Sequence, residues 1–394
     1  MTERLYYHDA YLQTFQARVI EAADGGRRVY LDRTAFYPTS GGQPYDLGTL
    51  GGITVVEVVD EEDRVSHVLD AALPPDRVST GDIEGQVDWA RRFDHMQQHT
   101  GQHLLSAVLA DLFDIPTLSF HLGDAASTIE VGAASLEAKR IEKAEERCAE
   151  IVREARPVVM TFEDSSADLG LRKASERTGT LRIISIDGVD RSACGGTHVR
   201  NTAEIGPVLI RKLDKVRGNV RLEFVCGLRA LRQARADFRT LTDISRSLSV
   251  PIEKTPTVAA GLVEKIKTAE KQSERLSTEL AHHEGKELYA STVPRADGIR
   301  FHTERGPIDD VLRARARAFT SGGKAVFLAV CENPPSVLLA ASPDSGIDAG
   351  ARVKAAVTAA GGRGGGNPSL AQGSVPDGSH LEQVVNSIFP VASL

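Results

Sequence analysis

The alternation of apolar and polar positions in the first 88 residues is typical of short β-strands. Side chains alternate over 15–22 and again over 28–33, and the sequence Asp24-Gly25-Gly26-Arg27 between them favours a hairpin turn. Further strands are predicted over 52–60, 65–69 and 81–88. Several short strands joined by regular turns predict a small β-barrel over residues 1–88.

Residues 89–227 mix helical and strand patterns, which predicts an α+β domain. A helix is predicted from Trp89 to about Phe113, where the sequence Asp114-Ile115-Pro116 ends it. A long, polar-faced helix is predicted over 135–156, with Ser135 as its N-cap. The remaining predictions are strands over 119–122, 126–131, 158–162 and 181–186, a short helix over 169–177, and an antiparallel pair over 208–212 and 220–225.

Two apolar stripes with three- and four-residue spacing follow within residues 228–290. The first stripe runs from Leu231 to Leu248 and the second from Leu262 to Leu280, and two prolines lie between them. Such stripes predict an antiparallel helical hairpin. Either stripe could instead dock on a neighbouring domain or on a second subunit.

The C-terminal segment, residues 291–394, has the rhythm of an α/β domain. Apolar runs over 325–330 and 337–341 are suited to buried strands, and 349–360 is predicted to be a helix. The glycine-rich stretch 361–373 is either a flexible linker or a nest of backbone N–H groups for a phosphate or a chain terminus. The chain as a whole is therefore predicted to be an α+β multidomain protein.

Composition places the chain among ordinary globular proteins. It has 394 residues, of which 41% are hydrophobic and 26% charged, enough for two or three domains with their own cores. No apolar run approaches the roughly 18 residues that span a bilayer, and the N-terminus lacks the apolar core of a signal peptide. The four cysteines show no paired spacing, so a reducing cytoplasm is expected rather than a disulfide framework.

The charge of the chain is acidic overall but locally basic. The net charge of −7 argues against wholesale non-specific binding to nucleic acid. Residues 211–235, called the basic segment below, nevertheless carry eight Lys and Arg residues against one Asp and one Glu. Taken alone, this segment is more simply a solvated face of a helix or strand.

Two pairs of candidate metal ligands share the same four-residue separation. His99 and His103 lie on one face of the predicted helix 89–113. Cys194 and His198 lie in a glycine-rich turn that lets two side chains converge. Each pair alone is a weak signal, but together they supply the nitrogen and sulfur donors of a tetrahedral zinc site. Thr100 stands where a zinc peptidase of the H-E-x-x-H type would need glutamate, which argues against that class.

The segment Thr34–Gly48 is predicted to be a rigid loop, because it contains two prolines and a Gly41-Gly42 pair. Thr34, Ser40 and Gln43 supply hydroxyl and amide groups that could recognise a small polar ligand. A simple turn explains Ser40-Gly41-Gly42 equally well unless the loop lies near the metal.

Four segments occur in an order and at spacings that resemble the editing domain of alanyl-tRNA synthetase. They are Thr34–Gly48, His99–Ser106, Cys194–His198 and Arg221–Gly227. The glycine-rich tail resembles the C-terminal domain of that enzyme, which also occurs in DHH-type phosphoesterases. The chain begins directly at the β unit and shows no class II aminoacylation motif, so no synthetase core and no ATP site are expected. It is therefore similar to the AlaX family of freestanding editing proteins, in the long form.

The resemblance implies hydrolysis of mischarged Ser-tRNA(Ala) in trans, with Gly-tRNA(Ala) as a further candidate substrate. A synthetase pocket built for alanine cannot strongly reject a side chain that only adds a hydroxyl, so a second hydrolytic site supplies the discrimination. The rival interpretation is a non-catalytic tRNA-binding or dimerisation module, because four protein ligands are the mark of structural zinc. A phosphoesterase is disfavoured, since the lone Asp94-His95 does not make the Asp-His-His motif.

The resemblance also implies roles for single residues. One Zn²⁺ per chain would be bound by His99, His103, Cys194 and His198, and the zinc would either lower the pKa of a water towards about 7 or only position the substrate. Thr34 would contact the serine hydroxyl, and Ser40, Gly41, Gly42 and Gln43 would line the same pocket. Thr34, Gln43, His99 and His103 are thus the catalytic candidates.

For the tRNA, the basic segment would contact the backbone, with Arg217 and Arg221 as the binding candidates. In the tail, Asn367 and Ser369 stand where relatives usually carry a basic and an acidic residue. We therefore expect the helical hairpin and the tail mainly to form a homodimer. How tRNA(Ala) is singled out stays open at this point.

Overall fold

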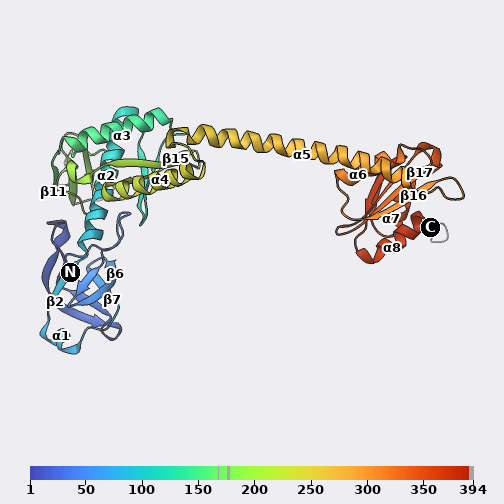
Figure 1. Ribbon diagram of the computed structural model, residues 1–394. Coiled ribbons are helices and arrows are strands. Elements are labelled where there is room, and N and C mark those ends of the chain that lie inside the picture. Colours follow the sequence, from blue (N-terminus) through green and yellow to red (C-terminus); the bar gives the residue numbers. More distant parts are fainter. Residues whose placement is uncertain (167, 175–177, 390–394) are drawn as a thin grey trace. The chain divides into compact units, whose positions relative to one another are not determined.

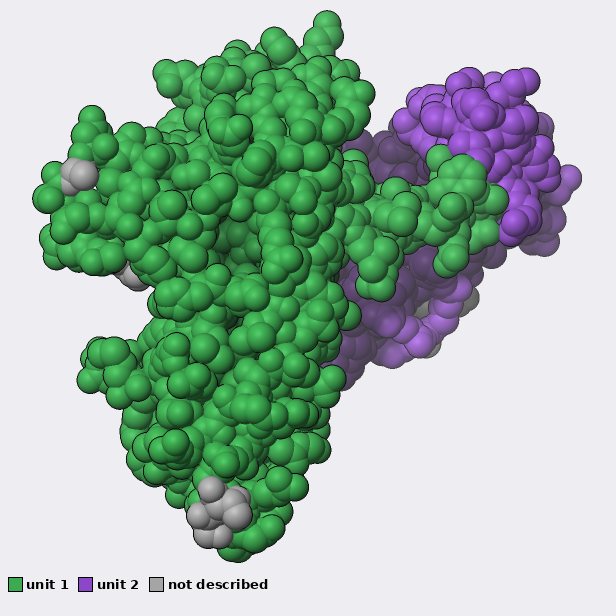
Figure 2. Space-filling model, turned by 90° about the vertical axis from the view of Figure 1, so that its left-hand side faces the viewer, with its two compact units in different colours: residues 1–243 green, residues 244–394 purple. Residues whose placement is uncertain are grey.

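The computed structural model describes residues 1–166, 168–174 and 178–389 (Figure 1). The chain forms two compact units, residues 1–243 and 244–394, which are coloured separately in Figure 2. The predicted mixture of helices with several sheets is confirmed. The four-part division into 1–88, 89–227, 228–290 and 291–394 is finer than these two units and stays a prediction. In the described part of the chain, no helix combines the length and apolarity needed to cross a bilayer.

The first unit begins with a closed β-barrel. Its strands follow the order β2 (Thr14–Ala23), β3 (Arg28–Leu31), β7 (Arg64–Leu69), β6 (Ile53–Glu61), β5 (Gly48–Leu50) and β8 (Asp82–Val87). The short helix α1 (Pro75–Thr80) lies between β7 and β8 in the chain, and β1 (Glu3–Arg4) pairs with β4 (Arg33–Thr34). Alternate residues of β2, such as Phe15, Ala17 and Val19, point into the barrel core. The barrel is thus built from the period-two pattern of its strands.

The long helix α2 (Trp89–Phe113) organises the rest of the first unit. Asp88 caps it by accepting a hydrogen bond from the backbone N–H of Arg91, and Asp114 ends it in the left-handed conformation. A Cβ on Gly101 would lie 2.3 Å from Cys226 Sγ, so the glycine lets α2 approach the next sheet closely. Two antiparallel sheets flank the helix, with the orders β14 (Val208–Val216), β15 (Asn219–Cys226), β10 (Ser127–Val131), β9 (Thr117–Leu122), and β11 (Val158–Asp164), β12 (Thr180–Ile186), β13 (Asp190–Ala193).

Two details of the local predictions change. The prediction of Ser135 as an N-cap is wrong, because helix α3 (Ala138–Arg153) begins after Glu137, whose side chain makes no capping hydrogen bond. The prediction of a helix over 169–177 is not borne out for residues 169–174, which are irregular. Residues 175–177 lie outside the described part of the chain.

A buried ion pair fixes the barrel against α2. The guanidinium of Arg92 bonds the carboxylate of Asp46, with Nε 3.0 Å from each carboxylate oxygen, and both side chains are fully buried. The other Arg92 nitrogens donate to the backbone carbonyls of Ala10 and Ala35. Because all three guanidinium nitrogens are bonded, the loop between β4 and β5 is held in one place on α2.

Helices α4 (Gly227–Ser247) and α5 (Thr255–Ser291) occupy the region where the two apolar stripes predict helices. Leu231 and Phe238 of α4, and Ile266, Leu276 and Leu280 of α5, are exposed large apolar side chains. The pairing of the two helices as a hairpin stays a prediction.

The second unit contains one mixed sheet covered on both faces. Its strand order is β16 (Arg300–Arg305), β17 (Ala325–Glu332), β18 (Pro335–Ala341), β20 (Leu370–Ser374) and β19 (Arg363–Asn367). Helices α7 (Ala349–Ala359) and α8 (Leu381–Ile388) form a core with one face, and α6 (Asp310–Thr320), with the end of α5, packs on the other.

The glycine-rich stretch is the β19–β20 hairpin of this sheet, so the linker interpretation is wrong. Small residues are required there because a Cβ on Gly364 would lie 2.7 Å from the Cα of Gly373 and 2.9 Å from the side chain of Val357. The alternative of a backbone nest gains no support from this pairing, since the strands use backbone groups to bond each other.

Candidate metal centre

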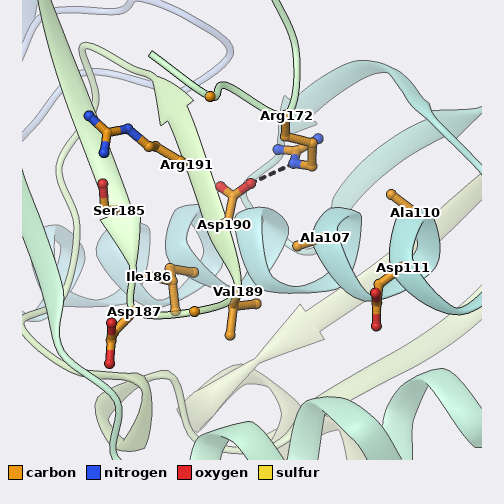
Figure 3. Close-up of a pocket in the computed structure, with 12 residues that line it drawn as sticks. Ala107, Ala110, Asp111, Arg172, Ser185, Ile186, Asp187, Val189, Asp190 and Arg191 are labelled. Atoms are coloured by element: carbon orange, nitrogen blue, oxygen red, sulfur yellow. Dashed lines mark hydrogen bonds and ion pairs between the residues drawn. The ribbon is translucent and has the colours of Figure 1, made fainter. Parts of the chain in front are cut away.

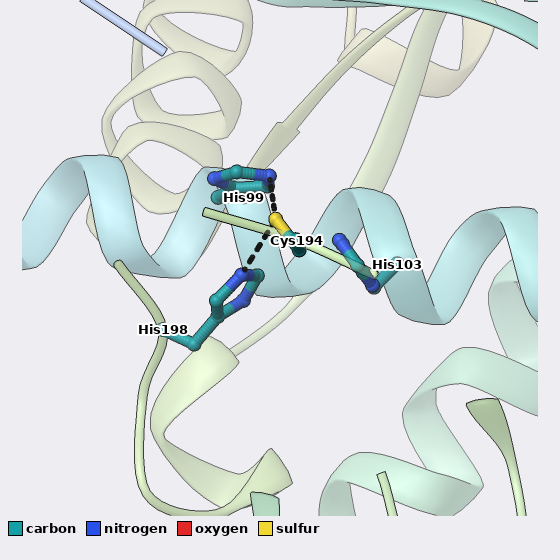
Figure 4. A group of neighbouring side chains, drawn as sticks. All are labelled: His99, His103, Cys194 and His198. Atoms are coloured by element: carbon teal, nitrogen blue, oxygen red, sulfur yellow. Dashed lines mark hydrogen bonds between the residues drawn. The ribbon is translucent and has the colours of Figure 1, made fainter. Parts of the chain in front are cut away.

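Four candidate ligands meet in the first unit (Figure 4). Helix α2 contributes His99 and His103, and the loop after β13 contributes Cys194 and His198. The potential ligand atoms all lie within 4.8 Å of one another. Cys194 Sγ is 3.4 Å from His99 Nε2 and 3.3 Å from His198 Nε2. A tetrahedral zinc with bonds of about 2.3 Å to sulfur and about 2.0 Å to nitrogen would separate these atoms by about 3.5 Å, so the donors fit zinc.

Each histidine of the cluster is held by the ring nitrogen that faces away from it. His99 Nδ1 lies 2.9 Å from Gln43 Oε1, and His103 Nδ1 lies 2.8 Å from Asp190 Oδ2. His198 Nδ1 lies 3.1 Å from Thr100 Oγ1. These partners orient the rings and leave the Nε2 atoms for the cluster, which is the arrangement found around metal-bound histidines.

Gly196, two residues before His198, is required by its close approach to His99. A Cβ on Gly196 would lie 2.2 Å from His99 Cε1 and 2.9 Å from Gln43 Oε1. Arg182 then fixes the loop, because its Nη1 donates to the carbonyl oxygens of Cys194 and Gly196 at 2.8 Å each. Its Nε donates to the Tyr7 carbonyl. The loop conformation thus depends on a partly buried cation that bonds backbone oxygens.

The charges in the cluster favour a thiolate and at least one neutral imidazole. Burial raises the pKa of Cys194, but the imidazoles of His99 and His198 outweigh it and hold that pKa well below its usual value. Burial, with the neighbouring His99, lowers the pKa of His198 to about 3. Burial also lowers the pKa of His103, but hydrogen bonds with Asp190 and Cys194 outweigh it and raise the pKa to about 9. A metal bound by His103 would therefore displace a proton there.

Asp190 is the most heavily bonded of the outer groups. Arg172 Nε donates to its Oδ1 at 2.6 Å (Figure 3). The Ser192 hydroxyl donates to its Oδ2 at 2.9 Å. Burial raises the pKa of Asp190, but the neighbouring His103 and Arg172 outweigh burial and bring the pKa down to about 2. Asp190 and Arg172 also line a cavity of about 610 Å³, shown in Figure 3.

Two further cavities open onto the cluster itself. Gly41, His99 and Cys194 line both of them. The smaller cavity, of about 320 Å³, is otherwise lined by Gln102, His103, Thr117, Leu118, Ser119, Phe120, Arg172, Lys173, Ala174, Ser192 and Ala193. The larger cavity, of about 630 Å³, is otherwise lined by Tyr7, Tyr37, Ser40, Phe162, Lys173, Ala174, Thr178, Thr180, Leu181, Arg182, Ala193, Gly195 and Gly196. The cluster is therefore accessible from outside.

The structure brings the loop Thr34–Gly48 to the cluster, as the interpretation of a ligand-recognising loop requires. Ser40 lines the larger cavity and Gly41 lines both. The carbonyl of Gly42 accepts a hydrogen bond from the backbone N–H of Leu122, which docks the loop on β9. Gln43 is fully buried, and its Oε1 accepts from His99 Nδ1 and from the backbone N–H of Thr197. Gln43 thus holds His99, one of the four candidate metal ligands, and is not among the residues that line the two cavities.

Thr34, Arg217 and Arg221 are not brought to the cluster. Thr34 is fully buried, its hydroxyl lies 2.8 Å from His67 Nε2, and it accepts a hydrogen bond from the Phe36 N–H at 3.1 Å. It is absent from the described residues that line either cavity. Arg217 and Arg221 are exposed in and after the turn between β14 and β15, and Arg221 lies 3.7 Å from Glu130.

Several contributing residues escaped the sequence-based predictions. Asp190, Arg182 and Gln102 each contact the ligands or line the cavities beside them. The sequence offered one signal for two of them, which is their closeness to a candidate ligand. Asp190 lies four residues before Cys194, and Gln102 lies one residue before His103. Arg182 had none, since only the folded loop brings it to the carbonyls it bonds.

Comparison with known proteins gives consistent similarities. A family model described as the threonyl and alanyl tRNA synthetase second additional domain matches residues 181–223. The chain is 32% identical to the alanyl-tRNA editing protein AlaX-L of Pyrococcus horikoshii, over 100% of this chain and 98% of that protein. It is 28% identical to the alanyl-tRNA editing protein Aarsd1 of Mus musculus, over 87% of each.

Longer proteins and one solved structure are also similar. The alanine–tRNA ligase of Pyrococcus abyssi is 31% identical over 98% of this chain, which spans only 43% of the ligase. The crystal structure of the C-Ala domain from Aquifex aeolicus alanyl-tRNA synthetase matches with a TM-score of 0.20 and 18% identity, over 23% of this chain and 90% of that one.

Proposed function

This chain belongs to the alanyl-tRNA editing protein family, and we propose that it is an aminoacyl-tRNA deacylase that hydrolyses Ser-tRNA(Ala) in trans. The observation that carries the proposal is the cluster of three imidazoles and a thiol beside two cavities. Its donor types are those that zinc prefers, and its accessibility suits a site that must admit an ester. Gly-tRNA(Ala) is the second substrate to be tested.

The residues of the chain have distinct parts in the proposed reaction. Gln43, Asp190 and Thr100 hold the imidazoles of His99, His103 and His198, so that their Nε2 atoms converge. Zn²⁺ bound there would act as a Lewis acid, either lowering the pKa of a water or holding the ester in place. Ser40, Gly41 and residues of β9 would form walls around the aminoacyl ester. Hydrolysis then breaks the bond between the aminoacyl carbonyl and the ribose oxygen.

The rival function is a non-catalytic tRNA-binding or dimerisation module with structural zinc. Four protein ligands favour it, because they complete a tetrahedral shell. Accessibility favours catalysis instead, since His99 and Cys194 each line both cavities.

The two functions separate in one hydrolysis assay. Wild-type protein, His99→Ala and the matched control His283→Ala, which changes an exposed imidazole of α5, are incubated with Ser-tRNA(Ala) and with Ala-tRNA(Ala). Zinc content is measured for all three proteins. We expect selective clearance of the seryl ester, loss of zinc and activity in His99→Ala only, and no change in the control. A wild type that binds zinc and tRNA but clears neither ester would establish the rival.

The basic segment is proposed to contact the tRNA backbone through its exposed members. Arg211 and Arg229 are engaged with Asp237 and Asp94, whereas Arg217 is exposed in the β14–β15 turn. Arg217→Ala should weaken tRNA binding uniformly and reduce the salt dependence by about one phosphate contact. An unchanged salt dependence would remove Arg217 from the interface. Because its substrate is tRNA, the protein is expected in the cytoplasm.

We further propose a homodimer formed through the helical region. Residues 262, 266, 269, 273, 276 and 280 of α5 have the four- and three-residue spacing of a coiled coil. The four large apolar side chains among them, Leu262, Ile266, Leu276 and Leu280, are all exposed. Sedimentation should show a dimer for the wild type and a monomer for Leu276→Glu. A wild-type monomer at micromolar concentration would contradict this proposal.

A further inference from the structure

The smaller cavity contains one side chain placed between two ligands of the cluster. Gln102 follows His99 by three residues on α2 and precedes His103 by one, so it shares a face with His99. It is only 6% exposed, yet it lines the smaller cavity together with both histidines. Its amide is therefore part of the cavity wall beside the place where the ester would bind.

Hydrogen bonds within the protein orient this amide. Gln102 Nε2 donates to Ser106 Oγ at 2.8 Å, and Thr117 Oγ1 donates to the same oxygen at 2.7 Å. Because the nitrogen of the amide is directed at Ser106, the carbonyl oxygen Oε1 points elsewhere. No donor among the described residues is bonded to Oε1, and this atom is not one of the buried polar atoms that lack a partner. Oε1 is thus an acceptor open to the smaller cavity.

Thr34, the residue expected to contact the serine hydroxyl, is placed differently. Its hydroxyl is already bonded to His67 and to the Phe36 N–H inside the barrel. A group that is fully buried and already hydrogen-bonded would have to give up a partner before it could contact a substrate. Gln102 has no such obstacle.

The sizes of the two cavities suit the two parts of an aminoacyl nucleoside. The smaller one, about 320 Å³, is lined by polar groups of Gln102, Thr117, Ser119 and Ser192. The larger one, about 630 Å³, contains the aromatic side chains of Tyr7, Tyr37 and Phe162, on which a base can stack. The aminoacyl group therefore fits the smaller cavity and the terminal nucleoside the larger.

We propose that Gln102 determines specificity, because its Oε1 accepts the hydrogen bond of the serine β-hydroxyl in the smaller cavity while Ser106 holds the amide. This inference rests on the proposed deacylase function. It accounts for rejection of alanine, since a methyl group would cover Oε1 without bonding it, and a polar site rejects analogues that lack the bonded group. Glycine leaves room for a water at Oε1 and is affected less.

The test measures kcat/KM for seryl, glycyl and alanyl esters of tRNA(Ala), with zinc content determined for each protein. Gln102→Met keeps the length of the side chain and removes the acceptor. It should lower kcat/KM for the seryl ester by about 10- to 100-fold, and it should raise the alanyl value, because the methyl group no longer covers an unbonded acceptor. The glycyl value should change by less than about threefold. Ser106→Ala should act in the same direction more weakly. Gln102→Glu keeps an acceptor and should retain the preference for serine.

One control variant and three outcomes decide the matter. Gln86→Met, at an exposed position of β8, should change nothing. An equal fall for all three esters, or loss of zinc from Gln102→Met, would overturn the proposal. The amide would then contact a group that all three esters share, or it would stabilise the fold. A selective loss of seryl hydrolysis in Thr34→Val, with Gln102→Met unchanged, would assign the hydroxyl contact to Thr34. A wild type that hydrolyses no ester would refute the deacylase function itself.

Discussion

The barrel and the metal cluster both bury histidines, but they use the ring nitrogens differently. In the barrel, His67 is fully buried, and its Nδ1 lies 3.1 Å from the Val29 carbonyl while its Nε2 lies 2.8 Å from the Thr34 hydroxyl. In the cluster, the protein supports each imidazole through Nδ1, and the Nε2 atoms converge around Cys194. The protein bonds both ring nitrogens of the barrel histidine, whereas each histidine of the cluster directs one nitrogen, Nε2, at the common centre.

This difference separates structural histidines from binding ones by the number of nitrogens that the fold itself satisfies. Burial of an imidazole is costly unless its nitrogens are bonded. The Nε2 atoms of His99 and His198 find their partner only in the shared Cys194 sulfur, and such convergence of several rings on one thiol indicates a common binding centre. His95, one turn before His99 on α2, is a third case. It is fully buried, and neither of its nitrogens has a partner among the described residues. His95 is not part of the group of converging ligand atoms found among the described residues, so we do not assign it to a metal site.

The largest expected effect follows from removing one nitrogen of the cluster. His198→Ala should reduce bound zinc from about one per chain to near none and slow Ser-tRNA(Ala) hydrolysis on the order of 10³-fold. His67→Gln is the matched change in the barrel. It should leave zinc bound and cost about 1–3 kcal/mol of unfolding free energy, because it disturbs two buried hydrogen bonds. Metal analysis and denaturant unfolding measure both quantities.

Equal loss of zinc from the two variants would erase the distinction between the two regions. The fold of the first unit, rather than the free nitrogens, would then determine whether metal binds. Circular dichroism at the assay temperature separates that outcome from simple unfolding.

The next largest effect is a pH dependence that belongs to the barrel alone. Burial lowers the pKa of His67 to about 4, against about 6.5 in the unfolded chain. The folded state therefore resists protonation, and the stability that neutral His67 contributes is complete above pH 6.5 and is lost as the pH falls towards 4. That difference corresponds to about 3 kcal/mol. The stability advantage of the wild type over His67→Gln should fall by about this amount between pH 7.5 and pH 4, so that it disappears or reverses at the lower pH.

Denaturant unfolding of zinc-loaded protein across this pH range provides the measurement. Groups that titrate in both proteins cancel in the difference, so the shrinking gap isolates the barrel histidine. Parallel stability curves would show that His67 protonates in the folded barrel as easily as in water.

The same comparison explains what the sequence could predict. The ligand set was predictable because each pair is local, with His99 and His103 on one helical face and Cys194 and His198 in one glycine-rich turn. Local periodicity also predicted most strands and helices, including α2 from Trp89 to Phe113. The glycine-rich stretch was predicted to be a linker or a backbone nest, and neither alternative anticipated the hairpin, because its strands depend on the close packing of α7, which no local pattern encodes.

The supporting residues were beyond local reasoning. Thr34 and Gln43 lie nine residues apart in one predicted loop. The hydroxyl of Thr34 is nevertheless bonded inside the barrel, whereas the amide of Gln43 supports His99. Their separation depends on contacts with His67 and Thr197, which are distant in the chain. A resemblance assigns residues to a site but does not tell which of them face the ligand and which hold the groups that do.

The smallest effect tests the outer bond of a single ligand. In Asp190→Asn the side chain keeps its shape but loses its charge, so the bond to His103 Nδ1 weakens and Arg172 loses its ionic partner. Zinc affinity should fall about 10- to 100-fold, the usual effect of changing such a group, while the site still fills at high zinc. Competition with a chelator measures this, with Asp187→Asn, an exposed carboxylate three residues earlier, as control. Unchanged zinc affinity in Asp190→Asn would mean that Asp190 serves the fold through Arg172. Zinc binding by the cluster would then not depend on the charge of a carboxylate outside the four ligands, just as the barrel histidine does not depend on one.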